Sequence, residues 1–404
     1  MFKHQIKGIL GNMLLNTFAA AVPGLILQMI VLPFLARTLG ATHYGLLITL
    51  LSVLNLIPAT LGNSLNNIKL LYRKKYEDEH VKGDFQIILL TECIVSIVFV
   101  VLFACFYTRN FPDFSFVNYL LLAVFAVLWI LREYYIVAFM LDIRYDCILI
   151  NNIIMGAGFL LGIGLYHISG LWELVYILGY ASSLGYIFLK TDLWKERLTK
   201  THLFKYICKE NIIYVLACLL YRVTSYADKM LLFPIIGGAL LSVYHTATLS
   251  GKIISMVITP VSGVMLAYLS KMNNSRGERS FHQILKIGSV VCLAVYFVCL
   301  LVSRPILGLL YPQFVEKAML YIPVTTATVI TGVMISLLNP FVLRYLSMTW
   351  QFVINIINVT AYIALAFVMM HFWGLWGFCM GCMIASFLKL LTIIVIYYKG
   401  IHRT

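Results

Sequence analysis

The chain has 404 residues, of which 62% are hydrophobic and only 11% are charged. Soluble globular domains carry roughly 25% charged residues, so this composition excludes an ordinary soluble domain and is typical of a polytopic membrane protein. The net charge of +14 would suit a nucleic-acid binder, but the basic residues flank apolar segments, where Lys and Arg report membrane topology. We therefore expect an all-α protein that crosses a lipid bilayer several times and binds no nucleic acid.

Twelve apolar segments are long enough to cross a bilayer, which takes about 20 residues per helix. The first segment is too long for the core of a signal peptide and lacks a small-residue cleavage pattern, so we expect it to be the first span. In chain order the predicted spans are 12–36, 43–66, 85–106, 116–139, 148–166, 170–189, 210–236, 240–268, 283–303, 318–340, 350–370 and 373–397.

Twelve alternating helices divide the basic residues unequally between the two sides of the membrane. One side receives 22 of the 30 basic residues and the other receives four. By the positive-inside rule the richer side is cytoplasmic, and both termini lie there. The cytoplasmic set comprises Lys3, Lys7, Lys69, Arg73, Lys74, Lys75, Lys82, Arg144, Lys190, Lys195, Arg197, Lys200, Lys205, Lys209, Lys271, Arg276, Arg279, Lys286, Arg344, Lys389, Lys399 and Arg403. The opposite set comprises Arg37, Arg109, Arg304 and Lys317.

The longest internal break, about 190–209, divides the predicted spans into six and six. We expect an N-terminal six-helix half (1–195), a basic cytoplasmic linker (196–209) and a C-terminal six-helix half (210–404). Residues of the first half recur in the second in the same order: Gly40, Tyr44 and Pro58, then Gly238, Tyr244 and Pro260. Two related halves around a midplane site are a common plan of secondary transporters.

The sequence carries no motif of a known catalytic chemistry. It has neither a Gly-rich phosphate loop nor a His-Glu-x-x-His or Ser-centred elbow, and no predicted loop is long enough to fold alone. The nine cysteines are scattered, and for the C-x-x-C of Cys379 and Cys382, inside the last apolar run, core packing is favoured over metal or redox chemistry. We expect a protein that is not an enzyme and needs no cofactor.

Six basic residues lie inside predicted spans, and two of them, Lys286 and Lys389, lie towards the cytoplasmic side. The other four are set deeper: Arg132, Arg222, Lys229 and Lys252. An ionised group in hydrocarbon costs about 2.5–3.5 kcal/mol on insertion scales, so such charges persist where they face a wet cavity or a partner. Arg222 and Lys229 are two helical turns apart and share one face. The helical rise places Lys252, on the next span, at a comparable depth. Because Asp228 is the only carboxylate beside them, these cations predict a cavity that attracts an anion.

Two structural interpretations of these charges stay open. Asp228 would neutralise Lys229 or Lys252 in a pair that fixes helix packing. Arg132 lies near the cytoplasmic end of its span, so it would pair with Glu133 or extend its side chain to the interface. The candidate substrate-binding residues are Arg222, Lys229, Lys252, Asp228, Arg132 and Glu133.

Four short motifs carry a family resemblance. Residues 37–45 have the form R-x-L-G-x-x-x-Y-G, residues 228–232 the form D-[RK]-x-x-L, residues 308–311 the form G-x-x-Y and residues 374–377 the form G-x-x-G. Together they resemble the polysaccharide flippases that export O-antigen and capsule repeat units, a branch of the MATE-like multidrug/oligosaccharidyl-lipid/polysaccharide exporter superfamily. One departure is Ser242, which stands where the family usually has glycine before the tyrosine at position 244.

The resemblance implies a MATE-like fold of about twelve transmembrane helices in a bacterial inner (cytoplasmic) membrane. The implied substrate is a lipid-linked oligosaccharide, a repeat unit of capsule or of the O-antigen of lipopolysaccharide carried on undecaprenyl pyrophosphate. It would pass from the cytoplasmic to the periplasmic leaflet by alternating access, and a cationic lumen suits its pyrophosphate. H+ or Na+ is the expected coupling ion, and a polysaccharide polymerase is an expected partner.

Three other functions are weighed against this one. A drug/cation antiporter of the same superfamily would need an acidic lumen, whereas the charge inside these spans is net positive. A major-facilitator-type solute transporter would carry a signature loop after the second span that residues 66–75 do not resemble. A membrane glycosyltransferase or polymerase would carry a large periplasmic loop, and the predicted topology has only short ones.

Overall fold

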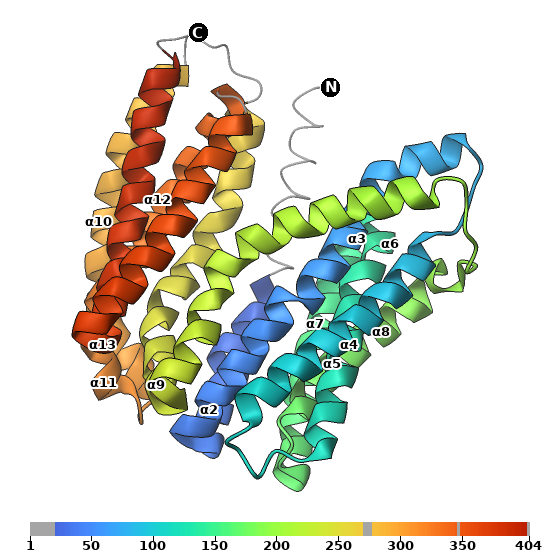
Figure 1. Cartoon of the computed structure of the whole chain (residues 1–404), viewed down its shortest axis with the longest axis horizontal. Helices are drawn as coiled ribbons and strands as arrows, with labels where there is room; N and C mark the ends of the chain where they lie inside the picture. The colour runs from blue at the N-terminus through green and yellow to red at the C-terminus, as the bar shows by residue number, and fades with distance from the viewer. Residues whose placement is uncertain (1–20, 270–276, 346–347, 402–404) are drawn as a thin grey trace. The chain divides into compact units, whose positions relative to one another are not determined.

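A computed structural model describes residues 21–269, 277–345 and 348–401, and every element in these ranges is a helix (Figure 1). Eight stretches of the described residues are long and apolar enough to span a membrane. The protein is therefore an all-α, multi-pass membrane protein, as its composition predicts. The start of the first predicted span, 12–20, lies outside the described residues, as do the loop residues Lys3, Lys7, Lys271, Arg276 and Arg403.

The chain forms two compact units, 1–238 and 239–404, which are described separately. The helices of the first unit are η1 (Leu27–Val31), α2 (Leu32–Leu56), α3 (Pro58–Asp78), α4 (Phe85–Thr108), α5 (Phe116–Tyr135), α6 (Val137–Leu141), α7 (Tyr145–Ser169), α8 (Glu173–Lys190), η2 (Leu193–Lys195) and α9 (Phe204–Leu269) as far as Gly238. Helices α4, α5, α7 and α8 pack against one another in this unit (Figure 1). The third to sixth predicted spans coincide with α4, with α5 and α6 together, with α7 and with α8.

Glycines break three long helices at or close to the junctions of consecutive predicted spans. Gly40 in α2, Gly237 in α9 and Gly374 have φ of 74°, 76° and 58°, a conformation that side chains with a Cβ disfavour. The backbone angles of Gly40 (φ 74°, ψ 170°) nearly equal those of Gly237 (φ 76°, ψ 168°). The recurrence of Gly40 in the second half therefore has its backbone counterpart at Gly237 and not, as the sequence suggested, at Gly238.

A proline interrupts the second predicted span. Helix α2 ends at Leu56 and α3 begins with Pro58, whose ring nitrogen has no hydrogen to donate. The break leaves carbonyl groups at the end of α2 without their usual helical partners. One of these carbonyls, that of Asn55, becomes part of the candidate site described below.

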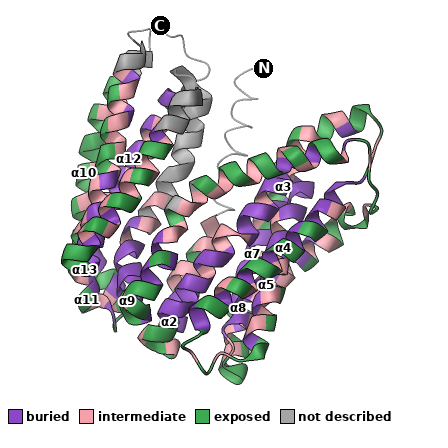
Figure 2. Cartoon of the chain, in the orientation of Figure 1, coloured by how far each residue is buried: buried purple, intermediate pink, exposed green. Residues whose placement is uncertain are grey.

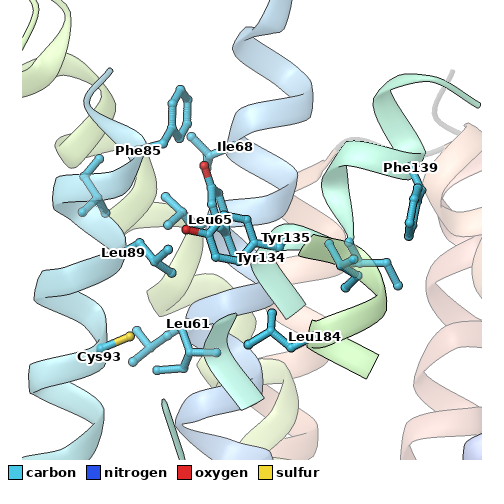
Figure 3. Packing of buried hydrophobic residues seen from close by; sticks show 14 of the residues in the cluster. Leu61, Leu65, Ile68, Phe85, Leu89, Cys93, Tyr134, Tyr135, Phe139 and Leu184 are labelled. Atoms are coloured by element: carbon cyan, nitrogen blue, oxygen red, sulfur yellow. The ribbon is translucent and has the colours of Figure 1, made fainter. Parts of the chain in front are cut away.

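The core of the first unit gathers apolar side chains from α3, α4, α5 and α8, some of which Figure 3 shows. Leu65 and Tyr134 are completely buried in it. The outer face of α4 is the opposite case, since Leu90, Ile94 and Leu102 are more than half exposed (Figure 2). Exposed apolar residues at helical spacing suit a surface that faces lipid instead of water.

The second unit contains the rest of α9 with α10 (Gly277–Leu310), α11 (Val315–Met319), α12 (Ile322–Tyr345) and α13 (Met348–Ile401). Helix α12 packs against both α10 and α13 (Figure 1). Three buried rings join these helices: the ring centroid of Phe281 lies 3.7 Å from that of Tyr397 and 5.4 Å from that of Phe341. These aromatic contacts fix the packing of three helices that the sequence shows only as separate apolar runs.

Candidate functional site

The first part of α9, residues 204–238, packs against other helices of the first unit. Near its start, the hydroxyl oxygens of Tyr206 and Tyr72 are 3.2 Å apart. Further on, the hydroxyl of Tyr107 in α4 donates a hydrogen bond to the carbonyl oxygen of Met230 at 3.0 Å. This segment corresponds to the seventh predicted span, which carries three of the candidate residues.

At its end, the same segment approaches α2 more closely than any side chain would allow. A Cβ on Gly45 would lie 2.1 Å from the carbonyl oxygen of Gly238, and a Cβ on Gly238 would lie 2.3 Å from that of Thr42. These glycines let two backbones touch. The first compact unit ends at Gly238. The boundaries expected from the sequence, with a linker at 196–209, remain a prediction about the two six-helix halves.

Asp228 and Lys229 form a buried ion pair within α9. The Lys229 Nζ lies 2.8 Å from Oδ1 and 3.0 Å from Oδ2 of Asp228, and the backbone N–H of Lys229 donates to Oδ1 at 2.9 Å. The side chains of Lys229 and Asp228 are 4% and 10% exposed. Asp228 therefore neutralises Lys229, as one of the two structural interpretations of the sequence proposed, and the net charge of the pair is zero.

Arg222 has a different partner. Its Nη1 donates to the carbonyl oxygen of Asn55 at 3.2 Å, two residues before the break between α2 and α3. The carbonyl end of a helix carries partial negative charge, so it attracts a guanidinium. Among the described residues, no carboxylate oxygen lies within 4 Å of Arg222, and the side chain is half-buried. A neutral carbonyl leaves the charge of Arg222 uncompensated.

Arg132 and Glu133 belong to a polar cluster at the end of α5. Arg132 Nη1 lies 2.7 Å from Glu133 Oε1, and its Nη2 donates to Oδ1 of Asn152 on α7. Asn66 of α3 donates to the backbone carbonyl of Glu133 at 2.8 Å. Helices α3 and α5 meet closely here, because a Cβ on Gly62 would lie 2.7 Å from the carbonyl oxygen of Ile130. The cluster supports the ion-pair interpretation of Arg132.

Lys252 belongs to the second unit, where its side chain is half-buried and its backbone carbonyl accepts a hydrogen bond from Ser255 at 2.8 Å. The expected grouping of Lys252 with Arg222 and Lys229 would join the two units. That grouping therefore stays a prediction from the helical rise.

Loops expected on the cytoplasmic side meet around an open pocket of about 920 Å³. Five Lys and Arg side chains and four carboxylates line it. Lys69 Nζ lies 2.6 Å from Glu196 of the linker, and Arg73 donates to the carbonyl oxygen of Leu141 at 2.6 Å. Since acidic partners match most of its basic residues, this pocket is a weaker attractant for an anion than its Lys and Arg content suggests.

Several buried ionisable groups in the first unit escaped the sequence-based candidates, Asp84 and Glu92 among them. Asp84 is fully buried and accepts hydrogen bonds from Tyr76 and from Thr201 of the linker. Glu92 is 6% exposed and accepts a hydrogen bond from Asn211 of α9 at 2.7 Å. The one sequence signal for Glu92 is that it is the only charged residue in the third predicted span.

Comparison with known proteins identifies the fold. No protein-family model and no curated protein sequence matches the chain. An inward-facing multidrug resistance MATE family transporter of the MOP superfamily superposes with a TM-score of 0.66 at 13% identity over 95% of both chains. The lipid II flippase MurJ, in an inward closed conformation, gives a TM-score of 0.67 at 15% identity over 98% of this chain and 87% of that one.

A third structure, the Vibrio cholerae MATE transporter VcmN in the bent form, gives a TM-score of 0.58 at 13% identity over 98% of both chains. At these identities the likeness is one of fold. The protein has the fold of MATE transporters and of a lipid II flippase, which confirms the expected MATE-like class.

Proposed function

We propose that this protein is a flippase that moves undecaprenyl-pyrophosphate-linked oligosaccharide repeat units, of O-antigen or capsule, from the cytoplasmic to the periplasmic leaflet of a bacterial inner membrane. The cargo is amphipathic and carries phosphate charges, which cannot cross hydrocarbon unaided. Alternating access between the two halves would let the head group pass while the lipid tail stays in the bilayer. The coupling ion, H+ or Na+, and a polymerase as partner belong to the same proposal.

Arg222 is the observation that carries the proposal. It lies half-buried in an apolar segment against the carbonyl of Asn55, without a carboxylate within 4 Å among the described residues. A guanidinium presents planar pairs of N–H donors that match phosphate oxygens, so it suits a pyrophosphate better than a cationic drug. The motif resemblance to polysaccharide flippases and the fold shared with a lipid II flippase also favour a lipid-linked substrate.

The test is complementation of a strain that lacks its own repeat-unit flippase and makes a matching repeat unit. The wild-type protein should restore surface polysaccharide, while the empty strain accumulates single lipid-linked units on the cytoplasmic leaflet. A polymerase defect would differ, since single units would still reach the periplasmic leaflet. Failure of the expressed, membrane-inserted protein to restore export with any tested repeat unit would contradict the proposal.

A drug/cation antiporter is the second candidate, favoured by the likeness to a multidrug resistance MATE transporter. Expression in a drug-sensitive strain distinguishes the two. The flippase proposal expects unchanged resistance to cationic drugs, because the charge at Arg222 repels them. Raised resistance without restored polysaccharide would replace the flippase with the antiporter.

A further inference from the structure

Glu92 and Asn211 form a buried pair that joins α4 to α9. Glu92 Oε1 accepts a hydrogen bond from Asn211 Nδ2 at 2.7 Å, and the two residues are 6% and 3% exposed. Each lies seven residues after the start of its helix, at Phe85 and Phe204, so each is about 10 Å from that helix end. The carboxyl group thus sits inside an apolar, membrane-spanning segment.

One oxygen atom of each side chain in this pair lacks a hydrogen-bond partner among the described residues. Glu92 Oε2 and Asn211 Oδ1 are buried and have no hydrogen-bond partner among the described residues. The hydroxyl of Ser96, one turn further along α4 and fully buried, also has none in that part of the chain. Buried polar atoms without partners are rare because each forfeits its hydration, and an unpaired carboxylate forfeits the most.

In the described part of the chain, no positive charge compensates Glu92. Among the described residues, no Lys, Arg or His nitrogen lies within 4 Å of its carboxyl oxygens. Glu92 interacts electrostatically with Cys93 of its own helix, Tyr134 of α5 and Cys208 of α9, and none of them supplies a cation.

Among the described residues, α2 and α3 do not supply a cation to Glu92 either. The buried cation of α3 is Lys69, which binds Glu196 at 2.6 Å and the Tyr134 hydroxyl at 3.2 Å instead. Residues 45–56 of α2 contain no titratable side chain. Glu92 is therefore a carboxyl group whose environment offers hydrogen bonding but no countercharge.

A proton on Glu92 would let the two unpartnered oxygens, Glu92 Oε2 and Asn211 Oδ1, form a hydrogen bond with each other. In the acid form, Glu92 is uncharged and Oε2 becomes a hydrogen-bond donor, for which the Oδ1 of Asn211 is an acceptor in need of one. A carboxylic acid and a carboxamide can then form two hydrogen bonds in place of one. We propose that Glu92 is a proton-binding site, loaded from the cytoplasmic side, and that its loading controls how firmly residues 204–238 pack against α4.

The link to transport rests on the proposed flippase function, whereas proton binding does not. The segment that carries Asn211 continues into Arg222 and then into the Asp228–Lys229 pair. Release of the proton places an uncompensated charge between α4 and this segment, which weakens their contact. A change in protonation is thereby passed along one helix to the residue that attracts the cargo.

Infrared spectroscopy of the purified full-length protein in nanodiscs tests proton binding directly. Titration should show a carboxylic C=O band that is lost in Glu92→Gln and kept, with a shifted frequency, in Glu92→Asp. The matched control is Glu210→Gln, next to Asn211 on the same helix, where Tyr72 donates to the half-buried carboxylate. This control should keep the band. A band identical in wild type and Glu92→Gln would overturn the proton site. Loss of the wild-type band when Na+ replaces K+ at constant pH would also overturn it, because Glu92 would then bind sodium.

Export in the complemented strain tests the coupling. Collapse of the transmembrane pH gradient with an ionophore should lower surface polysaccharide several-fold in wild type and in Glu210→Gln. Glu92→Gln should export little whether or not the gradient is present. Normal, gradient-dependent export by Glu92→Gln would overturn the coupling even if the infrared band is confirmed. If the wild type exports nothing, the flippase proposal fails and the infrared titration still decides the proton site.

Discussion

Lys229 and Asp228 are neighbours in the chain, and their charged groups meet: Lys229 Nζ lies 2.8 Å and 3.0 Å from the two carboxylate oxygens of Asp228. Successive side chains on a helix diverge by about 100°, so this contact requires both side chains to turn toward each other. The pair cancels its own charge within a buried part of α9. Arg222, seven residues earlier, is left as the cation of this segment with the strongest demand for an anion.

Breaking the Asp228–Lys229 pair from one side should destabilise the protein more than removing both charges. Removing one partner of a buried pair typically costs about 3–5 kcal/mol, because the other charge stays buried and alone. Asp228→Asn and Lys229→Met should each lower the thermal unfolding midpoint in detergent, and the double variant should recover much of the loss. A double variant with the summed effect of both single variants would show that the pair does not act as a unit.

Arg222→Ala should lower surface polysaccharide strongly without lowering the amount of protein in the membrane. Arg222→Lys should retain part of the activity if charge is what attracts the cargo, and less if the planar guanidinium geometry is needed. Quantitative immunoblotting of membranes beside polysaccharide staining separates activity from abundance. Full export by Arg222→Ala at normal abundance would remove Arg222 from the site.

Gly62→Ala should destabilise the packing of α3 against α5. The added Cβ would lie 2.7 Å from the carbonyl oxygen of Ile130 and 2.8 Å from the Cβ of Glu133, and overpacking of this kind costs about 1–3 kcal/mol. The matched control is Gly164→Ala in α7, where nothing lies within 4 Å of the added atom. Thermal unfolding should show a lowered midpoint for the first variant and an equal or raised midpoint for the second. Equal midpoints for both variants would contradict the close approach of the helices.

Asp84→Ala should release the linker from the ends of α3 and α4. The carboxylate accepts hydrogen bonds from the Tyr76 hydroxyl and the Thr201 backbone N–H, both at 2.7 Å, and bonds to a charged group contribute about 1.5–3 kcal/mol each. Limited trypsin digestion in membranes should cleave faster after Lys195, Arg197 or Lys200.

Asp192→Ala is the control for this experiment, since its pair with Lys195 is mostly exposed and such pairs contribute about 0–1 kcal/mol. Its cleavage rate should match that of wild type. If trypsin cleaves Asp84→Ala no faster than Asp192→Ala, the linker is held by other contacts.

The order of apolar segments in the sequence predicts the helices well, because a bilayer demands about 20 apolar residues wherever the chain crosses it. Predicted loops contain Gly40 and Gly237, where the backbone leaves helical geometry, whereas the third such glycine, Gly374, lies just inside the twelfth predicted span. The break at Pro58 was less clear, since the apolar run continues through it. The candidate charges were found for the same reason: Arg132, Arg222 and Lys229 stand out against hydrocarbon-like neighbours.

The sequence did not predict which side chains contact one another across helices. The hydrogen bond from Arg222 to Asn55 joins residues 167 positions apart, and the bond from Asn211 to Glu92 joins residues 119 positions apart. Apolar periodicity shows that a helix is buried but not which helix lies beside it. Lys69, counted from the sequence as a loop charge, proved to be buried for this reason, because it lies where the linker crosses α3.

By itself, the sequence determined that this is a helical membrane protein, approximately where most of its helices lie, and that Arg132, Arg222 and Lys229 lie inside them. The cost of placing polar groups in hydrocarbon is large and local, so composition alone reveals it. Only the tertiary structure decided which charges are neutralised, pairing Lys229 with Asp228 and Arg132 with Glu133 while leaving Arg222 on a carbonyl. Neutralisation depends on distances of a few ångströms between side chains, and helix packing sets those distances.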